Sequence, residues 1–222
     1  MLPRRTPRFR HGDSVPGALA YKFVELLGAG GFGEVWLAHD PFMEQFRAFK
    51  FCLDRQSRER LLTHEGQVVK RVMAASRDFR DDDHGIVPLG GAYLEGESPW
   101  LAYEYIDGGD LSSVARELVQ LAPTVRGARA VEILTDLATV VGRCHSMPQP
   151  LIHRDLKPAN ILVKQLGERW LLRITDFGIS HIAADRSVNR GSVSTPSMHL
   201  GETFRGAHTP IYASPQLNAK NM

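Results

Sequence analysis

Three side chains in the second half of the sequence have the types and spacing that phosphate chemistry requires. Asp155 lies in the segment His153–Asn160, Asn160 follows it after five residues, and Asp176 follows it after twenty-one. Phosphoryl transfer needs a base near the attacking hydroxyl and hard oxygen ligands for magnesium. We therefore predict that Asp155 accepts a hydroxyl proton and that Asn160 and Asp176 coordinate Mg²⁺. Lys157 would add positive charge at the transferring group.

A cluster of glycines near the start of the sequence could hold the phosphates. Residues 28–33 place Gly28, Gly30 and Gly33 in a G-x-G-x-x-G pattern. Glycines let the backbone approach a phosphate closely and offer its N–H groups as donors. The pattern alone is about equally typical of a plain tight hairpin. Strand-like sequence on both sides argues against a strand-to-helix dinucleotide turn.

Lys50 is a candidate to contact the same phosphates, and it needs a carboxylate to hold it in place. Glu65 falls on the apolar side of a predicted helix over residues 57–76, in line with Val69 and Val72. An uncompensated buried charge costs on the order of several kcal/mol, so a carboxylate in that position needs a cationic partner. We predict a pair between Lys50 and Glu65. The alternative is a Glu65 at the helix margin that reaches solvent.

The elements that must position these residues follow from hydrophobic periodicity. Alternating patterns predict strands over residues 21–27, 34–38, 46–53, 86–94 and 99–105. After a boundary at Gly108-Gly109, helical spacing predicts helices over residues 111–121 and 129–144. Short strands over residues 161–163 and 170–174 flank a turn at Gly167, which would place Asn160 and Asp176 at neighbouring strand ends. Residues 187–208 lack periodicity and are predicted to be a mobile segment.

Together these motifs, with Asp176-Phe177-Gly178, resemble the catalytic domain of eukaryotic-type Ser/Thr protein kinases over about residues 21–216. The resemblance implies an α+β, bilobal protein kinase-like fold. An antiparallel-sheet N-lobe would cover residues 21–106, and a mainly helical, incomplete C-lobe would cover residues 107–222, ending just after the activation segment. Lys157-Pro158 and Thr209 match residues typical of the Ser/Thr branch of the family. The sequence around the activation segment also resembles that of bacterial members.

The resemblance also implies a nucleotide site for MgATP. By position, the adenosine and phosphates would contact Gly28, Gly30, Gly33, Val35, Ala48, Lys50, Glu104, Ile106 and Asp110. Backbone groups of Glu104 and Ile106 would bind adenine, Tyr103 would limit the depth of the pocket, and the Asp110 carboxylate could accept from ribose hydroxyls. The composition around residues 103–106 is equally typical of an ordinary edge strand and turn.

The activation segment carries both a regulatory expectation and a departure from the family. Arg154 beside Asp155 implies control by phosphorylation, because a guanidinium can bind a phosphate in bidentate fashion. Candidate autophosphorylation sites are Thr203, Thr195 and Ser197, although hydroxyls are also common in any solvated loop. Ser214 and Gln216 replace the family's alanine and glutamate, so the usual ion pair to an arginine cannot form.

Composition limits the partners and the compartment. The chain has 222 residues and a net charge of +2. Residues 1–20 are basic and are predicted to be a disordered leader with no membrane span and no nucleic-acid partner. The alternative is an arm that binds nucleic acid or anionic lipid, which neither interleaved aromatic residues nor an amphipathic helix supports. Cys52 and Cys144 fit no disulfide framework, metal site or redox spacing, which favours a reducing cytoplasm.

The sequence leaves two hypotheses of function open, which belong to different classes of protein, and a third is also possible in principle. The leading one is an ATP-dependent Ser/Thr protein kinase that phosphorylates protein hydroxyls and itself. The second is a catalytically incompetent nucleotide-binding or scaffold module, and the third is a structural fragment that does not respond to nucleotide. Because the chain stops at Met222, we also expect an exposed apolar surface and a marginally stable, self-associating species, or a fragment of a longer kinase.

Overall fold

The computed structural model describes residues 6–30, 33–52, 66–79, 85–167 and 169–177. These residues fall into two compact units. The first takes its described residues from 1–66 and 87–105, and the second takes its own from 67–86 and 106–222. The chain crosses between the units after Gly66 and after Ile86, and it enters the second unit for the last time between Tyr105 and Ile106. The described part of residues 67–86, which lie within the predicted N-lobe range 21–106, groups with the second unit.

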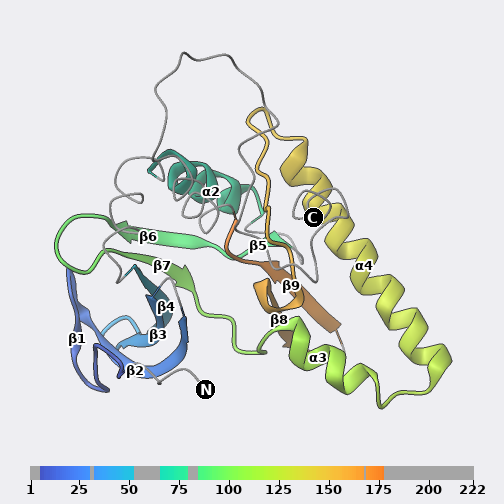
Figure 1. Cartoon of the computed structure of the whole chain (residues 1–222), viewed down its shortest axis with the longest axis horizontal. Coiled ribbons are helices and arrows are strands. Elements are labelled where there is room, and N and C mark those ends of the chain that lie inside the picture. Colours follow the sequence, from blue (N-terminus) through green and yellow to red (C-terminus); the bar gives the residue numbers. More distant parts are fainter. Residues whose placement is uncertain (1–5, 31–32, 53–65, 80–84, 168, 178–222) are drawn as a thin grey trace, which may run out of the picture. The chain divides into compact units, whose positions relative to one another are not determined.

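The first unit is an antiparallel sheet with the strand order β1-β2-β3-β4-β7-β6. Figure 1 shows these strands in blue to green. Their bounds are β1 (Ser14–Val15), β2 (Ala18–Gly30), β3 (Gly33–Asp40), β4 (Gln45–Cys52), β6 (Leu89–Tyr93) and β7 (Trp100–Glu104). The β-branched and aromatic residues of these segments favour strands, as the alternating patterns predicted.

One face of this sheet is an aromatic core. Trp36 on β3 lies opposite Phe49 on β4, and Phe51 lies opposite Trp100 on β7. All four side chains are buried, and their rings join a cluster that includes Phe23 of β2. Because side chains alternate along a strand, the residues between them point to the opposite face of the same sheet.

The prediction of a disordered leader is wrong for the described residues 6–20. Ser14–Val15 forms β1, β2 begins at Ala18, and Phe9 packs against the aromatic core. The Trp100 Nε1 donates a hydrogen bond of 2.7 Å to the carbonyl of Pro16. The physical reason is that the aromatic face would otherwise be exposed to water, and this segment covers it.

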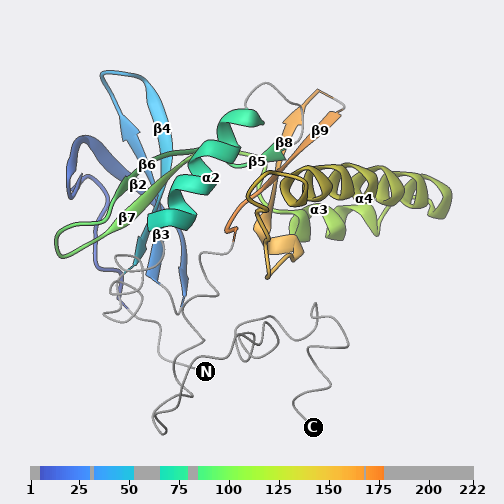
Figure 2. The same ribbon diagram turned by 90° about the horizontal axis from the view of Figure 1, so that it is seen from above.

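The described part of the second unit combines three α-helices with a small sheet of order β5-β9-β8. Its elements are α2 (Gly66–Asp78, which belongs to this unit from Gln67), β5 (Gly85–Ile86), α3 (Leu111–Leu118), α4 (Pro123–His145), the 3-10 turn η2 (Pro158–Asn160), β8 (Ile161–Leu166) and β9 (Arg169–Ile174). Figure 2 shows α3 and α4 in green to yellow and the strands β8 and β9 in orange. Strands β8 and β9 pair antiparallel, and β5 pairs with β9 in parallel.

Several element boundaries differ from the predicted ones. Helix α4 starts at Pro123 rather than residue 129, because proline at a first helical position loses no hydrogen bond there. The predicted strand over residues 86–94 is two strands, β5 and β6, which belong to different units. Helix α2 ends at Asp78, and residues 57–65 of the predicted helix lie outside the described residues.

Apolar side chains are exposed around helix α4. Val125, Val131 and Leu134 of α4 are 49%, 65% and 65% exposed, while Ile133 and Leu137 are buried. The helix therefore packs some of its apolar residues against its own unit and exposes others to water. Within the ranges that the structure describes, no helix is long and apolar enough to cross a membrane.

Candidate active site

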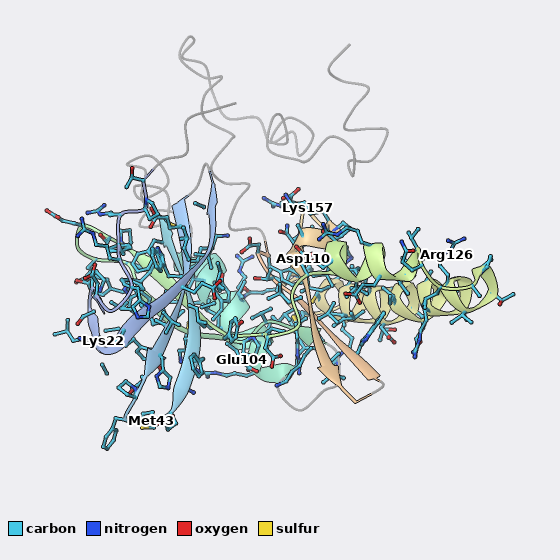
Figure 3. The ribbon with its side chains drawn as sticks, turned by 90° about the horizontal axis from the view of Figure 1, so that it is seen from below. Lys22, Met43, Glu104, Asp110, Arg126 and Lys157 are labelled. Carbon is cyan, nitrogen blue, oxygen red and sulfur yellow. The ribbon has the colours of Figure 1, made fainter. Side chains whose placement is uncertain are left out.

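The segment that carries Asp155 is held by a network of short contacts in the second unit. Lys157 Nζ donates to Asp155 Oδ2 at 2.7 Å, and Asn160 Nδ2 donates to the Asp155 carbonyl at 2.8 Å. Asn160 Nδ2 also lies 3.5 Å from Asp155 Oδ2. Lys157 is labelled in Figure 3. The structure thus brings together three of the predicted site residues and fixes the orientation of the carboxylate.

Local backbone structure explains why these three residues meet. Pro158 fixes its own φ and begins the turn η2, and the Asn160 N–H donates to the Lys157 carbonyl at 2.9 Å. This tight turn reverses the chain, so that the side chain of Asn160 reaches back to Asp155. The Asn160 side chain is buried, and a buried amide needs hydrogen-bond partners within the protein.

Asp176 is placed beside Asn160 by the pairing of β8 with β9. Ile161 lies opposite Ile174, and the Thr175 N–H donates to the Asn160 carbonyl at 2.9 Å. Asp176 has a φ of 63°, in the left-handed region that non-glycine residues seldom adopt. The neighbouring-strand prediction for Asn160 and Asp176 agrees with this register.

Backbone strain is concentrated in the same place. Among the described residues, the non-glycine residues with positive φ are Glu44, Arg154 and Asp176. Arg154 directly precedes the proposed base, and Asp176 is itself a proposed metal ligand. Such conformations cost on the order of 1–3 kcal/mol each and persist where the surroundings hold them. Their position here is consistent with a functional site.

His153 supports the site, in a role that its place in the segment His153–Asn160 did not specify. Its Nε2 donates to the Thr175 carbonyl at 2.7 Å, and its Nδ1 accepts from the Asp155 N–H at 3.3 Å. It therefore connects the segment before the base to the segment before Asp176. Its ring also contacts Phe177, with centroids 4.8 Å apart. The signal that could have found it is a histidine two residues before the base in an otherwise apolar stretch.

Burial sets the protonation state of His153. The residue is 4% exposed, and burial lowers the pKa of its imidazole below the usual 6.5. The hydrogen bond to Thr175 and the charges of Asp176 and Asp155 oppose that shift but are smaller. The ring is thus neutral at neutral pH, which agrees with one nitrogen donating and the other accepting.

The oxygen atoms at the end of this cluster suit a hard cation. The Asn160 amide uses its nitrogen as a donor to Asp155, which leaves its oxygen for a metal, and Asp176 supplies a carboxylate. Mg²⁺ commonly takes only one or two protein oxygens and completes its shell with phosphates and water. Asn160 and Asp176 together fit that requirement.

In the first unit, strand pairing places the predicted nucleotide residues in two rows on one face. Gly28 of β2 lies opposite Val35 of β3, and Val35 lies opposite Lys50 of β4. Ala48 is two residues before Lys50 and therefore on the same face, opposite Tyr103 of β7. The aromatic core occupies the other face. The aromatic cluster is thus separated from the candidate binding residues, and the buried Leu37 and Leu101 share the face of those residues.

The glycine turn has room for a ligand where the structure describes it. A Cβ added at Gly28 would meet no atom within 4 Å, so packing does not explain a glycine there. Gly30 pairs with Gly33, whose φ is 138°, and residues 31–32 lie outside the described residues. The absence of a side chain at Gly28 therefore leaves the backbone accessible, as phosphate binding requires.

The segment that joins the two units carries the adenine and ribose predictions. The Glu104 N–H, at the end of β7, donates to the Pro88 carbonyl at 2.9 Å, so the carbonyl is the backbone group that Glu104 could offer (Figure 3). Ile106 is buried in the second unit. Asp110 caps α3, because its Oδ1 accepts from the Ser113 N–H at 3.0 Å. This cap is a structural role that the ribose prediction did not include.

Some predicted residues cannot be placed. Glu65, the expected partner of Lys50, lies outside the described residues, as do the phosphorylation candidates Thr195, Ser197 and Thr203.

Comparison with known proteins identifies the class to which this fold and site belong. The chain belongs to the protein kinase family, because the model of the protein kinase domain matches residues 21–216. The match covers both units, and the resemblance inferred from the motifs is confirmed.

The similar relatives are named as Ser/Thr protein kinases or as a kinase subunit. Serine/threonine-protein kinase PknJ of Mycobacterium tuberculosis is 31% identical over 196 residues, which cover 84% of this chain and 31% of that protein. Serine/threonine-protein kinase PkaA of Streptomyces coelicolor is 29% identical over 207 residues, with 90% and 35% covered. Inhibitor of nuclear factor kappa-B kinase subunit beta of Bos taurus is 31% identical over 183 residues, with 79% and 22% covered. The chain thus spans about a third or less of the length of these relatives.

A solved structure confirms the fold. The crystal structure of the PknI kinase domain of Mycobacterium tuberculosis matches with a TM-score of 0.55 and 24% identity. The match covers 77% of this chain and 63% of that chain. The prediction of a protein kinase-like α+β fold, with an antiparallel-sheet N-lobe and a mainly helical C-lobe, is therefore confirmed.

Proposed function

We propose that this chain transfers the γ-phosphoryl group of MgATP to Ser or Thr hydroxyls of a protein substrate. The observation that carries the proposal is the contact cluster of Asp155, Lys157 and Asn160, joined through the strand pairing to Asp176. Phosphoryl transfer asks a protein to position groups and to neutralise charge, and this cluster contains a base, a cation and two oxygen ligands.

Asp155 acts as the base in this proposal. The hydroxyl oxygen of the substrate attacks the γ-phosphorus, the bond from that phosphorus to the β-phosphate oxygen breaks, and the hydroxyl proton goes to the Asp155 carboxylate. Lys157 and Asn160 orient that carboxylate through their contacts with Oδ2. A well-placed general base contributes about 10²–10⁴-fold to the rate.

The other residues of the proposed site bind Mg²⁺ and ATP and neutralise the charge of the phosphates. Asn160 and Asp176 hold Mg²⁺, which when bound offsets the charge of the phosphates. Lys157 lies close enough to Asp155 to place its ammonium beside the transferring group. The accessible backbone around Gly28 and the ammonium of Lys50, on the same face of the sheet, bind the phosphates. Val35 and Ala48 on that face, the backbone of Glu104 and Ile106, and Asp110 complete the proposed nucleotide contacts.

The test is phosphate incorporation from labelled ATP into a generic Ser/Thr protein substrate and into the chain itself. Purified wild-type chain is compared with Asp155→Asn, which keeps the shape of the side chain but removes the base. The matched control is Glu97→Gln, an exposed carboxylate in the turn between β6 and β7. We expect Asp155→Asn to lose at least about 10²-fold of the transfer and Glu97→Gln to lose none.

Two results would contradict the proposal. Equal transfer by wild type and Asp155→Asn would remove Asp155 as the base. ATP binding by a folded wild-type chain that transfers no phosphate would instead support the nucleotide-binding module considered from the sequence. Mapping any incorporated phosphate by mass spectrometry would test Thr203, Thr195 and Ser197 as acceptors.

A further inference from the structure

Residues 8–16, which we call the strap, lie across the two strands that flank the glycine turn. They precede residues 21–216, the part that matches the protein kinase family, so the family match does not account for them. The strap contacts β2 and β3 on the face that carries the aromatic core. The candidate nucleotide residues lie on the opposite face of the same strands.

The strap is hydrogen-bonded to β2. The Gly12 N–H donates to the Phe23 carbonyl at 2.8 Å, and the Phe23 N–H donates to the Asp13 carbonyl at 2.9 Å. His11 Nδ1 lies 2.8 Å from the Val24 carbonyl. These contacts pair the strap with β2, the strand that contains Gly28.

The strap is also connected to β3 through Glu34, the residue directly after Gly33. The Arg8 N–H donates to Glu34 Oε1 at 2.8 Å, and Trp36 Nε1 donates to Glu34 Oε2 at 2.8 Å. Glu34 is only 5% exposed, so each carboxylate oxygen needs its donor. The first residue after the glycine turn is thus fixed by one donor from the strap and one from the sheet.

Phe9 adds an apolar anchor to these hydrogen bonds. Its ring centroid lies 4.9 Å from that of Phe23 on β2 and 4.6 Å from that of Phe51 on β4. It also meets the edge of Trp36 on β3 at 6.5 Å. One side chain of the strap therefore touches three strands at once, which restrains their relative positions.

We propose that the strap is a positioning element for the glycine turn, and this inference rests on the proposed nucleotide binding. Glycines have no side chains with which to fix their own backbone, so the turn takes its position from the strands on either side. The strap holds Glu34 and Phe23 on the face of the aromatic core. It thereby fixes the positions of Gly28 and Val35 on the opposite face of the sheet. Phe9 and Glu34 act on the nucleotide through the turn and do not contact it.

The test compares Phe9→Ala with Phe42→Ala in the full chain. Phe42 is also a phenylalanine of the first unit, but it is 91% exposed in the turn between β3 and β4. We measure the Kd for MgATP, and KM and kcat for transfer, at a temperature where circular dichroism shows each variant to be folded. We expect Phe9→Ala to raise the Kd and the KM for ATP about fivefold with little change in kcat, and Phe42→Ala to change neither.

A second variant keeps the inference testable if Phe9→Ala does not fold. Glu34→Gln retains the shape of the side chain but can no longer accept both hydrogen bonds, and we expect a two- to fivefold rise in the same KM, on the order of one lost hydrogen bond. Phe9→Leu should restore most of the ATP affinity. Folded Phe9→Ala and Glu34→Gln variants with wild-type ATP affinity would overturn the strap's role alone. A folded wild-type chain that binds no ATP would overturn the proposed function, and the strap's role with it.

Discussion

The two units hold their candidate functional residues in different ways. In the second unit, Asp155, Lys157 and Asn160 contact one another directly within 2.7–3.5 Å. In the first unit, Gly28, Val35 and Lys50 are placed by strand register, each opposite the next. The second unit thus holds a hydrogen-bonded cluster. The first unit holds a row of residues across a sheet whose other face carries the aromatic core.

This difference indicates how function divides between the units. A cluster of charged and hydrogen-bonded groups suits proton and metal chemistry, because each member fixes the next. A row of small residues and one lysine suits binding of an extended charged ligand through backbone and ammonium contacts. We therefore expect substitutions in the row to weaken the binding or the positioning of the phosphates, and substitutions in the cluster to change proton transfer or metal dependence.

The largest effect within this comparison is expected at Lys50. Lys50→Met removes the ammonium and leaves a side chain of similar length, so strand β4 should fold as before. Loss of one charged contact to a transferring group commonly costs 10²–10³-fold, and we expect transfer to fall by about 10²-fold or more. Steady-state kinetics with labelled ATP, beside a thermal unfolding curve, check this. Unchanged turnover in folded Lys50→Met would remove Lys50 from the site.

A smaller effect is expected at the glycine turn. A Cβ at Gly28 would meet no protein atom within 4 Å, so Gly28→Ala should leave the unfolding temperature unchanged. It should obstruct a phosphate at that backbone, and the loss of about one hydrogen bond to a charged group corresponds to roughly tenfold in affinity. Titration of ATP into both proteins measures the difference. Equal affinities would show that the turn does not bind phosphate.

His153 predicts a pH dependence of stability in the second unit. Burial lowers the pKa of the folded imidazole below 6.5, so the unfolded chain binds a proton that the folded chain does not. The contribution of His153 is therefore fully present above pH 6.5, and it is lost as the pH falls below 6.5 toward the folded pKa. The slope is at most about 1.4 kcal/mol per pH unit.

Chemical unfolding at pH 7.5 and 5.5 checks this for the wild type and for His153→Gln. The wild type should lose more stability over that range than His153→Gln. His145→Gln, an exposed histidine at the end of α4, is the matched control and should behave like the wild type. An identical pH dependence in the wild type and His153→Gln would contradict the assignment.

The smallest predicted effect separates stability from function. Gly142 lies in the interior of α4, is exposed, and has no atom within 4 Å of an added Cβ. Gly142→Ala should stabilise the second unit by about 0.5–1 kcal/mol, because alanine favours the helix. Denaturant unfolding measures this gain, and transfer activity should not change. A change in turnover would mean that α4 affects the cluster directly.

The chemistry of the cluster could be predicted from the sequence because it depends on short spacings. Asp155, Lys157 and Asn160 lie within six residues, and a proline turn fixes their geometry. The position of Asp176 could also be predicted from the sequence, because two short strands joined by a turn at Gly167 pair as an antiparallel hairpin. The spacing did not reveal the hydrogen bond of His153 to Thr175, because the acceptor is a backbone carbonyl, a group that every residue carries.

The strap could not be predicted because few of its residues are apolar. Phe9 and Val15 stand among arginines, prolines and glycines, a composition typical of disorder. The indication lay in other strands, where residues 34–38 and 46–52 carry apolar side chains on both faces. A sheet that is apolar on both faces needs a cover on each, and the strap supplies one of them.

The most direct test of the division between the units is the effect of Mg²⁺ on ATP binding. Calorimetry with Mg²⁺ and with a chelator is run on the wild type, Asp176→Asn and Gly28→Ala. We predict that Mg²⁺ tightens binding to the wild type, that Asp176→Asn loses this enhancement but keeps its metal-independent affinity, and that Gly28→Ala weakens both and keeps their ratio. An undiminished Mg²⁺ enhancement in Asp176→Asn would contradict the assignment of the metal to the cluster.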